Sequence, residues 1–169
     1  MQRALILLIG LFSLVFGGSL YDLLIKEQIS SIPKDKAIVV GKGDKELIAV
    51  INPDCPHCRA EWKELRKHLD KLKVYIFVFP FKTWGEENLK KSYYIACSED
   101  KLKAIDEVML GKLDGKALNV SKCDLIEEHL KVVDRLGVNG VPYNIIPEKN
   151  KIIEGFSQNL LNELGIKGE

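Results

Sequence analysis

One stretch of sequence decides the fold: Leu47-Ile48-Ala49-Val50-Ile51-Asn52-Pro53-Asp54-Cys55-Pro56-His57-Cys58. Its first part belongs to an apolar run over Glu46–Ile51, which predicts a buried strand. A helix is predicted from Pro56 to Leu72, because apolar side chains recur at offsets of 4, 3 and 4, the spacing of one helical face. These side chains are Cys58, Trp62, Leu65 and Leu69. The two cysteines therefore lie where a strand passes into a helix.

The position of Cys55 at a helix start predicts its chemistry. Pro56 suits the first helical turn because it has no N–H group and its φ angle is fixed. The free N–H groups and the dipole of the helix favour an anion there, which lowers the pKa of Cys55 and makes it an accessible, acidic nucleophile. Cys58 begins the buried stripe and is expected to be shielded and protonated, so that it resolves the mixed disulfide. His57 lies beside the first sulfur and favours its thiolate further.

The cysteine pair has two alternative interpretations. A C-x-x-C pair can be half of a zinc site, but structural zinc needs four ligands, and Cys97 and Cys123 are too far apart to form a second close pair. A purely structural Cys55–Cys58 disulfide is the second alternative. His68 and His129 are expected to be solvated helix residues, as are the charged side chains on the outer face of the helix from Pro56. Those are Arg59, Glu61, Lys63, Arg66 and Lys67.

A second signal is Gly137-Val138-Asn139-Gly140-Val141-Pro142, which leads into a predicted strand. Proline removes a donor from a strand, so its presence there needs a reason. A cis Val141–Pro142 bond would turn the chain sharply and free the Val141 backbone to bind an extended substrate. An ordinary trans proline that opens an edge strand is the alternative.

The rest of the chain alternates strands and helices in an α/β order. Further strands are predicted over 36–40, 74–79, 143–146 and 151–153, with a hairpin turn at 41–44 after the first. Helices are predicted over 20–30, 86–97, 101–110 and 124–136, with a last one around Leu160–Leu164. This order predicts a central sheet with a parallel core, helices on both faces and an antiparallel hairpin at the end.

The N-terminus predicts the compartment. Residues 1–17 have the layout of a secretory signal peptide: Arg3 at the start, an apolar run over Ala4–Phe16, then small residues. An uncleaved membrane anchor is the alternative. Residues 18–35 form an N-terminal segment and residues 36–169 the main domain. Outside the cytosol disulfides persist, so the four cysteines are interpreted as redox groups. A net charge of +1 gives no basic field, which argues against nucleic-acid binding.

On these motifs the chain resembles the catalytic, thioredoxin-like domain of the DsbC/DsbG family of thiol:disulfide interchange proteins. The stretches Tyr94-Ile95-Ala96-Cys97, Ala104–Met109 and Cys123-Asp124 resemble that family's second cysteine pair. The resemblance implies a thioredoxin-like fold with a helical insertion, a cis-proline at Pro142 and a structural disulfide between Cys97 and Cys123.

Two departures from that family matter, together with a difference from thioredoxin and DsbA. About 18 residues separate Gly18 from the first strand, in place of an N-terminal dimerisation domain, so a monomer is expected. Pro56-His57 and the valine before Pro142 resemble the DsbA oxidase instead. Position 49 is alanine, where thioredoxin and DsbA place a buried acid, so proton transfer must use water or another group.

The leading hypothesis is a periplasmic thiol:disulfide oxidoreductase, an oxidase or an isomerase, that uses no cofactor beyond its Cys55–Cys58 disulfide. It would act on cysteine-containing secreted proteins and be reset by a membrane redox partner. The alternative is a non-catalytic, chaperone-like module that binds thiols or peptides in a groove near Phe81, Trp84, Pro142 and Tyr143.

Overall fold

The computed structural model describes residues 20–157 and 159–166. The predicted signal peptide, residues 1–17, lies outside the described residues. Within the described ranges, no helix is both long and apolar enough to cross a membrane. The chain divides into two compact units, residues 1–32 and 33–169. In the first, residues 20–30 are helical, as the sequence predicts.

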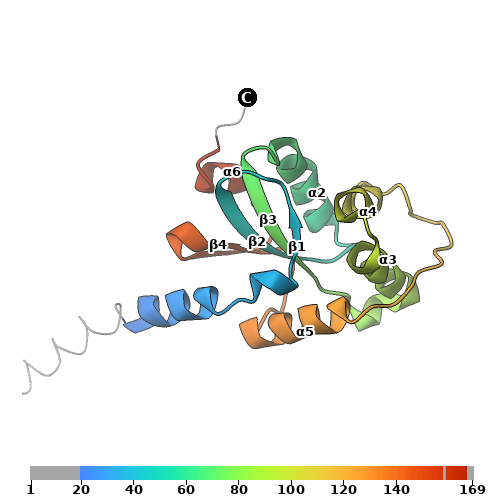
Figure 1. Ribbon diagram of the computed structural model, residues 1–169, viewed down its shortest axis with the longest axis horizontal. Helices are drawn as coiled ribbons and strands as arrows, with labels where there is room; N and C mark the ends of the chain where they lie inside the picture. Colours follow the sequence, from blue (N-terminus) through green and yellow to red (C-terminus); the bar gives the residue numbers. More distant parts are fainter. Residues whose placement is uncertain (1–19, 158, 167–169) are drawn as a thin grey trace, which may run out of the picture. The chain divides into compact units, whose positions relative to one another are not determined.

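The second unit is built on a five-stranded mixed sheet (Figure 1). Its strands are β1 (Ile38–Val40), β2 (Lys45–Ile51), β3 (Leu72–Val78), β4 (Tyr143–Ile146) and β5 (Lys151–Glu154). They lie in the order β1-β3-β2-β4-β5. The pair β2 and β3 is parallel, whereas β1–β3, β2–β4 and β4–β5 are antiparallel. The predicted parallel core and terminal antiparallel hairpin are confirmed.

The predicted hairpin turn at 41–44 is wrong, because β1 pairs with β3 and not with β2, with Val40 opposite Val74. Residues 41–44 instead connect β1 to β2 and lie close to the backbone at the start of β3. Gly43 N–H donates to the Leu72 carbonyl over 3.0 Å, and a Cβ on Gly43 would lie 1.9 Å from the carbonyl carbon of Lys71. Gly41 has φ +80°, a conformation that glycine adopts without strain. These glycines therefore serve a close backbone approach.

Helices cover both faces of the sheet, and Figure 1 shows α2 and α5 on opposite sides of it. They are α2 (Pro56–Leu65), α3 (Gly85–Cys97), α4 (Lys101–Met109), α5 (Leu125–Leu136) and α6 (Leu160–Glu163), with short 3-10 turns at Lys34–Lys36, Arg66–His68, Lys82–Trp84 and Pro147–Lys149. The helix predicted to reach Leu72 ends at Leu65, and β3 begins where that prediction ended.

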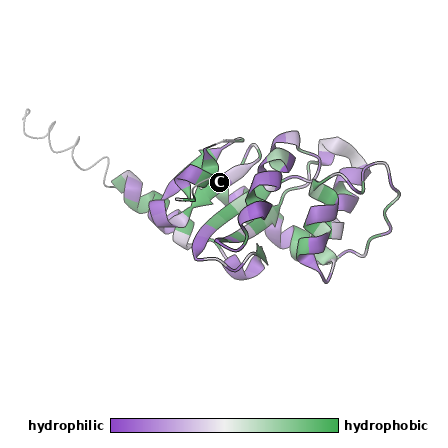
Figure 2. Ribbon diagram, turned by 90° about the horizontal axis from the view of Figure 1, so that it is seen from above, coloured by the Kyte–Doolittle hydropathy of each residue, from purple (hydrophilic) through white to green (hydrophobic). Residues whose placement is uncertain are grey.

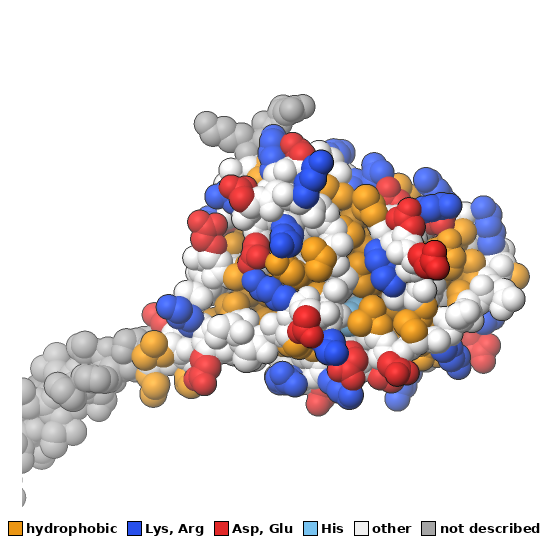
Figure 3. Space-filling model, in the orientation of Figure 1, with side chains coloured by type: hydrophobic (Ala, Val, Ile, Leu, Met, Phe, Trp, Pro, Cys, Tyr) orange, Lys and Arg blue, Asp and Glu red, His pale blue; other side chains and the backbone are white. Residues whose placement is uncertain are grey.

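Side chains alternate across the sheet, as the pleat requires. On one face, Val74 and Ile76 line the same small cavity as Trp62 of α2. On the other, the ring of Phe77 meets His129 of α5 edge-on, with ring centroids 5.2 Å apart. In Figure 2 the strands are largely coloured as hydrophobic, whereas the helices carry both hydrophilic and hydrophobic residues. On the face drawn in Figure 3, basic and acidic side chains are interspersed.

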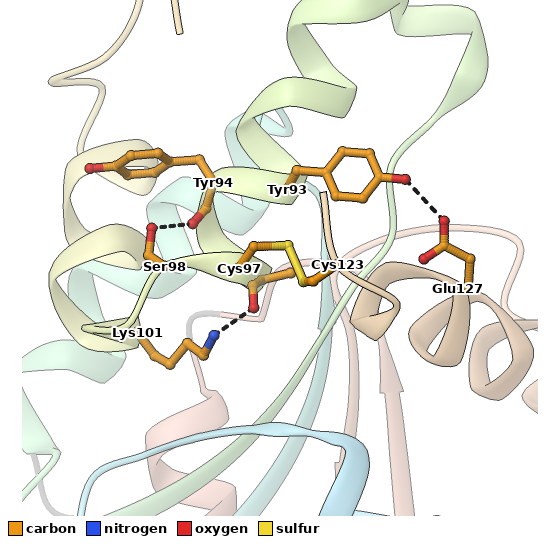
Figure 4. The surroundings of a disulfide bond; sticks show 8 residues. Tyr93, Tyr94, Cys97, Ser98, Lys101, Cys123 and Glu127 are labelled. Carbon is orange, nitrogen blue, oxygen red and sulfur yellow. Dashed lines mark hydrogen bonds between the residues drawn. A yellow bond between two sulfur atoms is a disulfide. The ribbon is translucent and has the colours of Figure 1, made fainter. Parts of the chain in front are cut away.

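A disulfide joins Cys97, the last residue of α3, to Cys123, just before α5 (Figure 4). The two Cα atoms are 5.8 Å apart, and 26 positions separate them in sequence. Beside the bond, the Ser98 hydroxyl donates to the Tyr94 carbonyl over 2.6 Å. The disulfide thus closes a loop that contains α4 and fastens it to the start of α5.

Candidate active site

Cys55 is the N-cap residue of α2, and Pro56 is the first residue of that helix. The backbone N–H of Cys58 donates to the Cys55 sulfur over 3.3 Å, so the sulfur occupies the position of a capping acceptor. The Asn52 side chain accepts from Asp54 N–H over 2.8 Å, which shapes the turn between β2 and α2. The strand-to-helix junction therefore aims the free N–H groups of α2 at one sulfur.

The two thiols of the pair differ strongly in acidity. The pKa of Cys55 is lowered to about 6, mainly by a hydrogen bond from the Cys58 side chain, with help from the backbone N–H groups of Cys58 and His57 and from the His57 charge. Burial raises the pKa of Cys58 far above its ordinary value, and the neighbouring Cys55 sulfur raises it further. This difference suits an attacking Cys55 and a resolving Cys58.

The expectation that Cys55 is accessible is wrong for this structure. Its side chain is only 4% exposed, against 1% for Cys58. The loop before β4 covers it, and the Cys55 sulfur lies 3.6 Å from the carbonyl oxygen of Val141.

The structure brings Val141 and Pro142 to the cysteines from 86 positions away. The Val141–Pro142 peptide bond is cis. Upstream, α5 ends at Gly137, which takes the left-handed conformation at φ 66°. Val141 is half-buried and Pro142 is buried. The segment thus lies against the nucleophile, in the position proposed for substrate binding.

Pro56 and His57 are both exposed at the start of α2. The His57 ring lies nearly parallel to the ring of Phe156, with centroids 6.4 Å apart and an interplanar angle of 19°. The His57 charge contributes to the lowered pKa of Cys55, and its side chain stays exposed at the start of α2.

The expectation that Glu61 is a solvated residue is wrong, because it is 2% exposed. Its burial beside Trp62 makes the buried face of α2 broader than the predicted stripe. Asn144 of β4 donates to Glu61 Oε2 over 2.8 Å. The spacing of Glu61, three residues after Cys58, is the signal that could have placed it on the cysteine side of the helix.

An ion-pair network holds the turn before Cys55. Lys91 of α3 is 8% exposed and contacts Asp54 and Asp114, the latter over 2.8 Å. Arg59 of α2 makes a two-pronged contact with Asp114 at 2.6 and 2.8 Å. Asp114 lies within the loop that the Cys97–Cys123 disulfide closes. The network thus connects the helical insertion to the residue preceding Cys55.

The sequence also matches a known family. Residues 32–157 match the family described as Thioredoxin-like domain, which is most of the chain. The chain belongs to the thioredoxin-like family. Its sheet order, helices and Cys55-Pro56-His57-Cys58 junction confirm the predicted thioredoxin-like α/β fold.

Relatives of this thioredoxin-like chain include thiol:disulfide interchange proteins. It is 25% identical to DsbC of Salmonella typhimurium over 139 residues, which cover 79% of this chain and 55% of DsbC. The chain thus spans about half the length of the curated relatives it matches. A disulfide interchange protein of Neisseria gonorrhoeae shares its fold with a TM-score of 0.64 at 24% identity, covering 79% of this chain and 99% of that one. The thiol-disulfide exchange protein α-DsbA2 of Wolbachia pipientis gives a TM-score of 0.61 at 20% identity, covering 85% and 95%.

The thioredoxin-like domain also carries an apolar groove of about 640 Å³. Phe79, Phe81, Leu89, Tyr93, Ile126 and Leu130 are among its lining residues. Phe81 also contacts Trp84 edge-on, with ring centroids 5.1 Å apart. Within the described part of the chain, the groove lining does not include Pro142 or Tyr143. The groove expected for a chaperone-like module is therefore present around Phe81 but does not extend to Pro142.

Proposed function

We propose that the protein is an extracytoplasmic thiol:disulfide oxidoreductase that exchanges its Cys55–Cys58 disulfide with cysteines of secreted proteins. The observation that carries the proposal is the pairing of an acidic thiol at the helix start with a buried, protonated one beside it. The similarity to DsbC supports the same reaction class. The exchange needs no cofactor beyond the disulfide.

In the oxidising direction, a substrate thiolate attacks the Cys55 sulfur and breaks its bond to Cys58, which leaves and takes up a proton. A second substrate thiolate then attacks the substrate sulfur of the mixed disulfide. A substrate disulfide forms, and Cys55 departs as the thiolate that the helix start stabilises. The two electrons left on the cysteines pass to a membrane redox partner, which restores the disulfide.

We propose oxidation as the favoured direction. The contacts that stabilise the Cys55 thiolate stabilise the reduced protein, and this makes the disulfide a stronger oxidant. The reduction potential should therefore lie several tens of millivolts above that of thioredoxin, about −270 mV. Equilibration with glutathione measures it, and a value at or below that of thioredoxin would favour a reductase.

Oxidation of a reduced dithiol peptide tests the activity itself. One equivalent of the oxidised wild-type protein should oxidise one equivalent of the peptide. Light scattering should show that the protein is a monomer. Cys55→Ser should abolish the reaction, whereas Glu64→Gln, an exposed change on the same helix, should leave it intact. Activity that persists in Cys55→Ser would contradict the proposal.

The groove around Phe81 supports a second candidate, a chaperone-like function in which this surface binds unfolded segments. Such binding would not depend on the cysteines. Cys55→Ser would then keep its affinity for an unfolded peptide, whereas Phe81→Asp would lose it. Equal binding by Phe81→Asp and the wild type would rule out this function.

A further inference from the structure

Glu61 is a carboxylic acid enclosed within the thioredoxin-like domain. One of its oxygens, Oε2, accepts the hydrogen bond from Asn144. The other, Oε1, is buried and has no hydrogen-bond partner among the described residues. Burying an unpaired polar atom is costly, so such a group calls for an explanation.

The carboxyl group lies beside the resolving cysteine. Glu61 and Cys58 both line a cavity of about 10 Å³ beneath α2, which has room for about one water molecule. The other lining residues are Ala49, Ile51, Trp62, Leu65, Val74 and Ile76. Glu61 is thus the only acidic residue among the described residues that line this cavity with Cys58.

Glu61 also lines a second, larger pocket of about 310 Å³ on the side of α6. Phe156, Ser157, Leu160 and the exposed Glu64 line it as well. Glu61 is therefore shared between the small cavity of Cys58 and a larger pocket that an exposed side chain borders. Cys58 is not among the described residues that line this larger pocket, whereas Glu61 borders both spaces.

We propose that Glu61 is the proton-transfer residue of Cys58, an inference that rests on the proposed thiol:disulfide exchange. When a mixed disulfide joins Cys55 to a substrate, the Glu61 carboxylate takes the Cys58 proton, directly or through one water. The Cys58 thiolate then attacks the Cys55 sulfur. The bond between Cys55 and the substrate sulfur breaks as the Cys55–Cys58 bond forms, and the substrate leaves as a thiolate. In the opposite direction, protonated Glu61 returns the proton to Cys58 as it leaves.

The electrostatics of the cavity agree with this role. Burial raises the pKa of Glu61 to about 8, against the opposing hydrogen bond from Asn144, and the Cys55 charge raises it further. The titratable groups that face Glu61 from α2 are Cys55, Cys58 and Glu64. The described residues of β2, β3, β4 and α6 that border it contribute no charged side chain. Forming the mixed disulfide removes the Cys55 charge, which favours the Glu61 carboxylate when Cys58 must lose its proton.

Reaction of the reduced protein with an aromatic disulfide tests the proposal, because each step releases one coloured thiolate. The first phase reports attack by Cys55, and the second reports attack by Cys58 on the mixed disulfide. At pH 7, Glu61→Gln should slow the second phase roughly 100-fold, within the range for general acid–base catalysis, and leave the first at least as fast. Glu99→Gln, a change at an exposed glutamate that lines neither cavity, is the matched control and should change neither phase.

The two phases distinguish a failure of the proposed exchange function from a failure of the proposed role of Glu61. A missing first phase in the wild type would overturn the proposed exchange function itself. An intact first phase with equal second phases in Glu61→Gln and Glu99→Gln would overturn the role of Glu61 alone. Should Glu61→Gln not fold, the wild-type pH profile decides. The second phase should rise as Glu61 ionises and then level off, whereas a continuous rise with pH would contradict the proposal.

Discussion

The backbone N–H of Val78 donates a hydrogen bond to Nδ1 of His129 over 3.0 Å. Because Nδ1 accepts, the ring carries its hydrogen on Nε2, which donates to the Lys36 carbonyl over 2.9 Å. His129 is fully buried, contrary to its predicted solvation. Burial lowers its pKa to about 4, and protonation of Nδ1 would set two donors against each other. This histidine is therefore a neutral connection between α5 and the sheet.

His129 should make stability depend on pH. Its pKa is near 6.5 in the unfolded chain and about 4 in the folded one, so between these values the unfolded state binds more protons. Stability should thus be complete above about pH 6.5 and fall as the pH approaches 4. In denaturant unfolding, His129→Asn should weaken this dependence while keeping an acceptor for Val78. The control His68→Asn should retain it.

A substitution that removes the hydrogen-bond acceptor for Val78 N–H should lower the free energy of unfolding more than His129→Asn does. His129→Leu leaves the buried Val78 N–H unpaired, and we expect a loss of about 1–3 kcal/mol in the free energy of unfolding. A loss no greater than that of His129→Asn at pH 7 would show that the hydrogen bond contributes nothing measurable.

The contrast between His129 and Cys55 shows what the sequence can predict. The strand, the cysteine pair and the helix after it are adjacent in the chain, so local patterns predict their arrangement. His129 and Glu61 are polar residues whose partners, Val78 and Asn144, lie 51 and 83 positions away. Helical periodicity predicts that a polar residue is exposed to solvent, because a buried hydrogen-bond partner so far away in the sequence cannot be recognised from the local pattern.

The error at 41–44 has a related cause. Two closely spaced glycines predict a tight turn, but they do not show whether the strands on either side of the turn pair with each other. That pairing depends on the order of all the strands in the sheet. Here the register of β1 against β3 is set by residues more than 30 positions away, such as Val74 opposite Val40. The Cys97–Cys123 disulfide, by contrast, was implied by resemblance to a family and lies where that resemblance places it.

The disulfide should stabilise the fold through its loop. In the chain-entropy model, a bond across 26 positions should contribute about 3.5 kcal/mol. Cys97→Ala with Cys123→Ala should lower the free energy of unfolding by about that amount and leave peptide oxidation largely intact, since neither sulfur takes part in exchange. Unchanged stability in the double variant would show that the bond adds nothing to the fold.

The Cys55 thiolate should stabilise the reduced protein as pH rises. The pKa of Cys55 falls from its ordinary value of 9.0 to about 6 on folding, so the folded state releases a proton first. The stability of the wild type relative to Cys55→Ser should increase from about pH 6 to about pH 9 and stay constant above that. Below about pH 6, the Cys55 thiolate should no longer make the wild type more stable than Cys55→Ser. Thermal unfolding of both reduced proteins across this range measures the difference.

The central claim is that Cys55 is the thiolate nucleophile and Cys58 the protonated, resolving thiol. The rate of alkylation of the fully reduced protein as a function of pH, with the modified cysteine identified by mass spectrometry, tests this claim most directly. We expect a single ionisation with a midpoint near pH 6 and modification of Cys55 alone. A midpoint near the ordinary value of 9.0, or modification of Cys58 before Cys55, would contradict it.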